Sequence, residues 1–155
     1  MRRGHRGSAV IGLAVLAMAA QGCGTQPATN TSPSAEASAG ALLPTTMTPA
    51  DEAPDWAIVI SLGPGPVFEP ENVTGQGEAL TFFLDASEIN EGSAHNFTIG
   101  PELPPAAPLA ESDFIQRGES AVFTVTGLAP GTYAFWCSVE EHHSLGMTGT
   151  LVVEP

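Results

Sequence analysis

Four side chains that can bind a soft metal ion lie in one order along the chain. Cys137 follows the aromatic stretch Tyr-Ala-Phe-Trp, and His142 and Met147 come five and ten residues later. The other histidines of the chain are His95, His143 and one near the N-terminus, and His95 is the candidate for the fourth donor. A thiolate, two imidazoles and a thioether are the donor set of a trigonal copper site, and they suit both Cu(I) and Cu(II). The sequence therefore predicts a site for one copper ion, which exchanges single electrons.

Two predicted strands lie on either side of these donors. Tyr133–Trp136 precedes Cys137, and Thr150–Val153 follows Met147, so the segment between them is a loop fixed at both ends. Cysteine, histidine and methionine can then reach one point at a small cost in conformational entropy. The adjacent His143 also gives a plausible loop, with three residues before Met147. The spacing alone leaves both histidines open.

The rest of the domain, residues 56–155, is predicted to be all-β. It alternates short apolar, β-branched or aromatic runs with glycine and proline, and no stretch of ten residues has helical periodicity. The predicted strands include 56–60, 79–84, 121–125 and 150–153, with a turn at 127–131. Residues 101–108 carry four prolines and are predicted to form a loop. This spacing favours a Greek-key β-sandwich of seven to eight strands.

Over essentially this whole domain, the pattern resembles the cupredoxin family of plastocyanin-like and azurin-like type 1 blue-copper proteins. The matching residues are Cys137, His142 and Met147 at their spacing, the following Gly149-Thr150-Leu151, and the upstream His95-Asn96-Phe97. The resemblance implies a cupredoxin-like sandwich with one copper ion. It implies Cys137 as the equatorial thiolate, His95 and His142 as the equatorial imidazoles, and Met147 as the axial ligand.

The resemblance also implies contacts behind the ligands. Asn96 follows the first ligand and Ser138 follows the cysteine, and a hydrogen bond between them would hold the two ligand segments in register. The family spacing favours His142 over His143. Related loops often carry Pro-Gly before the histidine, whereas Glu140 and Glu141 stand here, so the resemblance does not define the shape of this loop.

The N-terminus has the features of an export signal. Arginines near the start precede an uncharged run, 9–20, which predicts a signal peptide over residues 1–22. The run ends in Ala-Gln-Gly-Cys, which resembles the lipobox of bacterial lipoproteins and implies lipidation of Cys23. Residues 23–55 are rich in Pro, Ser, Thr and Ala and are expected to be a disordered linker. The chain is thus expected to be exported and lipid-anchored to the cell membrane, facing the periplasm or the exterior.

The charge distribution narrows the choice of partners. Beyond residue 6, the chain has 17 acidic residues but a single basic one, Arg117, and it has no lysine. Such a surface repels nucleic acid and predicts redox protein partners with a basic docking face.

The donor set is compatible with three classes of function. The leading interpretation is a one-electron carrier outside the cytoplasmic membrane. The alternative is an extracytoplasmic copper-binding protein for copper storage, delivery or resistance, which would use the same ligands. An enzyme is not expected, because nitrite reductases and multicopper oxidases need further histidines for additional copper centres.

Overall fold

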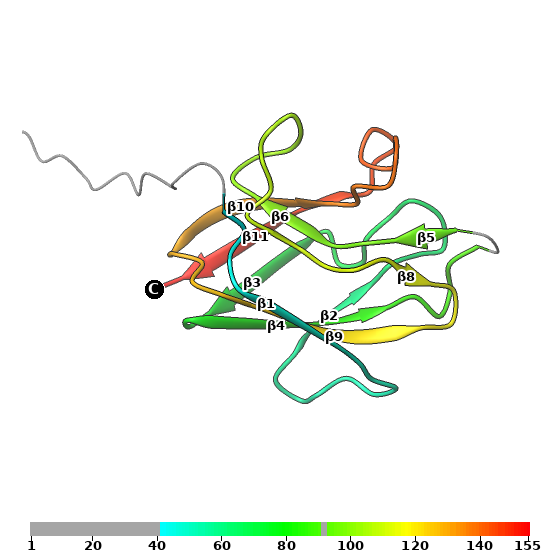
Figure 1. Cartoon of the computed structure of the whole chain (residues 1–155), viewed down its shortest axis with the longest axis horizontal. Coiled ribbons are helices and arrows are strands. Elements are labelled where there is room, and N and C mark those ends of the chain that lie inside the picture. Colours follow the sequence, from blue (N-terminus) through cyan, green and yellow to red (C-terminus); the bar gives the residue numbers. More distant parts are fainter. Residues whose placement is uncertain (1–40, 91–92) are drawn as a thin grey trace, which may run out of the picture. The chain divides into compact units, whose positions relative to one another are not determined.

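In the computed structural model, which describes residues 41–90 and 93–155, every regular element is a β-strand (Figure 1). The predicted signal peptide, Cys23 and the linker up to residue 40 lie outside the described residues. Within the described ranges, no helix is long and apolar enough to cross a membrane.

The strands form two main sheets, seen as two layers in Figure 1, and one small sheet. The first has the order β1-β9-β4-β2, the second β3-β11-β10-β6-β7, and the small sheet pairs β5 with β8. The strands of the first sheet are β1 (Thr45–Pro49), β9 (Ser120–Thr126), β4 (Ala79–Asp85) and β2 (Ile58–Ser61). Those of the second are β3 (Asn72–Gln76), β11 (Thr148–Glu154), β10 (Gly131–Trp136), β6 (Thr98–Gly100) and β7 (Ala110–Glu111). The small sheet consists of β5 (Ala94–His95) and β8 (Ile115–Gln116).

This topology confirms the predicted all-β sandwich. Two pairs, β2–β4 and β3–β11, are parallel and the other pairs are antiparallel, and the crossings between sheets are consistent with a Greek key. The eleven strands of the described residues exceed the expected seven to eight because β5, β7 and β8 are only two residues long. No strand forms in the proline-rich segment 101–108, as predicted.

The core is built from alternating residues of facing strands. In β9, Ala121, Phe123 and Val125 are buried while their neighbours are partly exposed, which is the period of a half-buried strand. Five phenylalanine rings fill the interior, and Phe97 contacts the other four at centroid distances of 4.9–6.3 Å. Because Phe97 follows His95 and Asn96 directly, this packing anchors the first predicted ligand segment in the core.

The structure corrects the expected N-terminal boundary of the domain. Residues 45–49, assigned to the linker on composition, form β1 and pair with β9 over five residues. Leu43 and Met47 pack against the core beside this pairing. Threonine is common in disordered segments but also favours strands, so composition alone did not reveal the partner in β9. Trp56, expected to begin a strand, instead lies 77% exposed before β2.

We expect removal of residues 1–49 to destabilise the domain by about 2 kcal/mol more than removal of residues 1–40. The longer deletion exposes the edge of β9 and the apolar surface under Leu43 and Met47. Urea unfolding of the two truncated proteins measures the difference. Equal midpoints and slopes would contradict a structural role for β1.

Candidate metal centre

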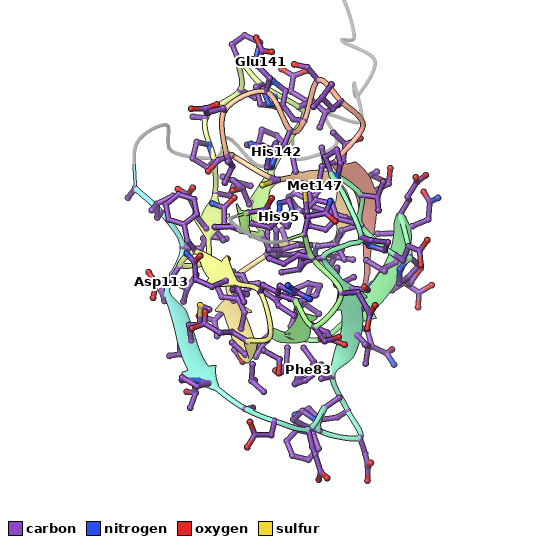
Figure 2. All side chains as sticks on the ribbon, turned by 90° about the vertical axis from the view of Figure 1, so that its right-hand side faces the viewer. Phe83, His95, Asp113, Glu141, His142 and Met147 are labelled. Atoms are coloured by element: carbon purple, nitrogen blue, oxygen red, sulfur yellow. The ribbon has the colours of Figure 1, made fainter. Side chains whose placement is uncertain are left out.

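Three separate segments bring the predicted donors together. His95 ends β5, which is held by pairing with Ile115 of β8. Cys137 follows β10, and Met147 precedes β11, so both lie where two hydrogen-bonded strands open into a loop. Figure 2 shows His95, His142 and Met147 gathered in one region of the domain.

The donor atoms lie at separations that suit a single ion. His95 Nδ1 and His142 Nδ1 are 3.1 Å apart, and Cys137 Sγ lies 3.7 Å and 3.6 Å from these two nitrogens. Nitrogen and sulfur donors bound at about 2.0–2.3 Å from one metal ion lie about 3–4 Å from each other. Cys137 is fully buried and His95 is 2% exposed, so the group is largely shielded from water.

The two adjacent histidines have different surroundings. His142 lies with His95 and Cys137 in a group whose ligand atoms are all within 4.8 Å of one another. The ring of His143 instead places Nε2 3.4 Å from Ser144 Oγ. The structure therefore brings His142, and not His143, to the other two donors.

Backbone hydrogen bonds set the shape of the loop. The Cys137 N–H donates to the Met147 carbonyl at 3.1 Å, and the Met147 N–H donates to the His142 carbonyl at 3.0 Å. Met147 is thus held opposite Cys137, with its side chain fully buried. Glu140 has a φ of 35°, in the left-handed region that favours glycine. The loop therefore places a glutamate in a backbone conformation that non-glycine residues rarely adopt.

A pair of polar residues joins the two ligand segments, as the resemblance implied. Asn96 Oδ1 accepts a hydrogen bond from the Ser138 N–H at 2.7 Å, and Asn96 Nδ2 donates to Ser138 Oγ at 2.8 Å. Sequence reasoning missed a third member, Glu111. Its Oε1 accepts from Asn96 Nδ2 and from Ser138 Oγ, both at 2.8 Å. Nothing in the sequence distinguishes Glu111 from the other acidic residues.

Comparison with known proteins identifies the family. The sequence profile of the family described as "Copper binding proteins, plastocyanin/azurin family" matches residues 65–154, which is more than half of the chain. The chain belongs to this family. Its members are cupredoxins, and the donor set of His95, Cys137, His142 and Met147 fits the one copper ion of a cupredoxin.

Individual relatives agree with this identification. The chain is 33% identical over 93 residues to a chloroplastic plastocyanin of Oryza sativa subsp. indica, covering 56% of this chain and 54% of that protein. It thus spans about half the length of the first curated relatives it matches. A plastocyanin of Daucus carota is also 33% identical over 93 residues, and here 87% of the relative is covered.

Solved structures agree with the fold. Auracyanin B superposes with a TM-score of 0.56 at 23% identity, covering 69% of this chain and 94% of that one. A dithionite-reduced auracyanin from the photosynthetic bacterium Roseiflexus castenholzii has a TM-score of 0.54 at 24% identity, covering 66% and 100%. These structural similarities support the assignment of a cupredoxin-like β-sandwich fold.

The surroundings of the donors set their protonation in the metal-free cupredoxin. Burial, and then the nearby charge of His142, lower the pKa of His95 from 6.5 to about 4. Burial raises the pKa of the Cys137 thiol, while the backbone N–H groups of Asn96 and Val139 act in the opposite direction. At neutral pH, His95 therefore offers a free lone pair, and the thiol must lose its proton when a metal ion binds.

The lowered pKa of His95 predicts a pH dependence of the metal-free protein's stability. The unfolded chain protonates His95 near pH 6.5, but the folded state resists protonation down to about pH 4. Between these values the unfolded state binds more protons, so the free energy of unfolding should fall as the pH is lowered through this window. Urea unfolding at several pH values measures the slope. The His95→Asn variant should have a shallower slope, and equal slopes would contradict the assignment.

Proposed function

We propose that this cupredoxin is a one-electron carrier in which His95, Cys137, His142 and Met147 bind one copper ion. The observation that carries the proposal is the placement of Cys137 Sγ within 3.7 Å of two imidazole nitrogens in a buried site. Copper bound to such a donor set supplies a centre that takes up and releases one electron. The similarity of the chain to plastocyanins supports this function.

The chain's own residues favour transfer of electrons over transfer of the metal. Cys137 and Met147 are fully buried, and the loop that carries them is closed by backbone hydrogen bonds. Donors held in this way move little when the charge of the site changes, which lowers the reorganisation needed at each step. Among the four donors, His142 alone is partly exposed, so we take its ring as the route by which electrons reach a partner. The acidic surface favours a partner with a basic docking face.

We further propose that the protein works outside the cytoplasmic membrane, exported by the signal peptide 1–22 and anchored through lipid on Cys23. The support is the order of arginines, apolar run and Ala-Gln-Gly-Cys in the sequence. The linker that follows Cys23 would let the domain reach partners on the same membrane. In a bacterial host, Cys23→Ser should move the full chain from the membrane fraction to the soluble fraction.

One experiment separates electron transfer from copper storage or delivery. The copper-loaded full chain is cycled between ferricyanide and ascorbate while a competing copper chelator is present. A carrier should complete many cycles with its copper retained. Transfer of the copper to the chelator within a few cycles would overturn the carrier function and favour copper handling.

A further inference from the structure

We propose that Glu111 is a positioning residue of the copper site, which acts as the common acceptor that fixes Asn96 and Ser138. The inference rests on the proposed copper ligands, because Asn96 follows His95 and Ser138 follows Cys137. Glu111 touches none of the four donors, and its effect on them passes through these two neighbours.

The hydrogen bonds determine how the Asn96 amide is oriented. The Ser138 backbone N–H can only donate, so the amide atom 2.7 Å from it must be the oxygen of Asn96. Asn96 Nδ2 then faces Ser138 Oγ and Glu111 Oε1, each at 2.8 Å, and its two hydrogens are both used. A third contact, to Thr98 Oγ1, is longer at 3.4 Å.

Glu111 supplies the acceptor for the hydroxyl hydrogen of Ser138. Ser138 Oγ receives a hydrogen bond from Asn96 and must direct its own hydrogen elsewhere, and Glu111 Oε1 takes it at 2.8 Å. One carboxylate oxygen therefore accepts from both residues and closes a three-membered ring of hydrogen bonds. Because this one oxygen accepts from both groups, it fixes the Ser138 hydroxyl and the Asn96 amide relative to each other.

The backbone holds Glu111 in place to do this. Glu111 ends β7 and pairs with Thr98 of β6, two residues beyond Asn96. The next residue, the buried Ser112, is bonded to Phe97 twice: its N–H donates to the Phe97 carbonyl, and its Oγ accepts from the Phe97 N–H. Residues 111–112 are thus hydrogen-bonded to the segment that carries His95 and, through Ser138, to the segment that carries Cys137.

This geometry separates the hydrogen-bonding role of Glu111 from its charge. Glu111→Gln keeps an acceptor oxygen and nearly the same size, whereas Glu111→Ala removes the acceptor. Loss of an outer partner of a metal ligand typically weakens metal binding by about 10–100-fold. Because Glu111 acts through Asn96 and Ser138 and not on a ligand directly, the alanine variant should bind copper about 10-fold more weakly, at the lower end of this range. The glutamine variant should stay within about 3-fold of the wild type.

The test measures copper affinity of the full-length wild type and variants by competition with a Cu(I) chelator. Glu78→Ala, at an exposed acid in the turn between β3 and β4, is the matched control and should leave the affinity unchanged. Unchanged affinity in Glu111→Ala, an equal loss in Glu111→Gln, or the same loss in Glu78→Ala would each overturn the positioning role.

A second measurement keeps the inference separate from the copper proposal. In the metal-free full chain, amide hydrogen exchange of the Ser138 N–H reports the Asn96 contact directly. We expect exchange at least about 10-fold faster in Glu111→Ala and restored in Glu111→Gln. Unchanged exchange would overturn the inference. A wild type that binds no copper would overturn the proposed function alone, since the exchange result would still decide the role of Glu111.

Discussion

His142→Ala should lower the affinity for Cu(I) by more than about 100-fold, whereas His143→Ala should change it by less than about 3-fold. The difference follows from geometry, because His142 Nδ1 lies 3.1 Å from His95 Nδ1 and 3.6 Å from Cys137 Sγ. Removing a ligand should cost more than the 10–100-fold typical of an outer partner. His143 faces Ser144 and contributes no donor to this group.

Competition titration of both full-length variants against a Cu(I) chelator measures these affinities. Each variant is the natural control for the other, since the residues are adjacent and chemically identical. A larger loss in His143→Ala would mean that the loop binds copper through His143 and not through His142.

Phe97→Ala should lower the free energy of unfolding by about 3–5 kcal/mol. Phe97 is fully buried and packs against the rings of Phe68, Phe82, Phe123 and Phe135. The loss combines the apolar surface returned to water with the cavity left among the four rings. Urea unfolding of the metal-free protein measures it.

Phe114→Ala is the matched control for this prediction. The same side chain is removed, but Phe114 is 58% exposed, and the expected change is within about 1 kcal/mol. Similar losses in the two variants would contradict the central position of Phe97. Because Phe97 follows Asn96, the alanine variant should also loosen the segment that carries His95.

The sequence was sufficient to predict those features that depend on local pattern. The alternation of Ala121, Phe123 and Val125 predicts a strand with one buried face, and the structure has β9 there. The proline-rich segment 101–108 predicts a loop because each proline removes a backbone hydrogen-bond donor, and the structure has no strand there. The order of soft donors around Cys137 predicts a copper site because few other metals suit that set.

Features that depend on distant partners were missed or left open. β1 forms because the edge of β9 is available to Thr45–Pro49, and nothing within that short threonine-rich segment reveals this pairing. Glu111 reaches Asn96 and Ser138 only through the pairing of β7 with β6. The choice between His142 and His143 is a shift of one residue in a loop. The local sequence pattern does not define which ring lies beside Cys137 and which lies beside Ser144.

The most direct test of the copper site is the visible absorption spectrum of the full chain after addition of Cu(II), beside the Cys137→Ser variant. A thiolate bound to Cu(II) in a trigonal site gives an intense charge-transfer band at about 600 nm. We expect this band in the wild type and its complete loss in the variant, because serine cannot supply the thiolate. A folded wild type that stays colourless with Cu(II) and an added oxidant would contradict the blue-copper site and the electron-carrier function that depends on it.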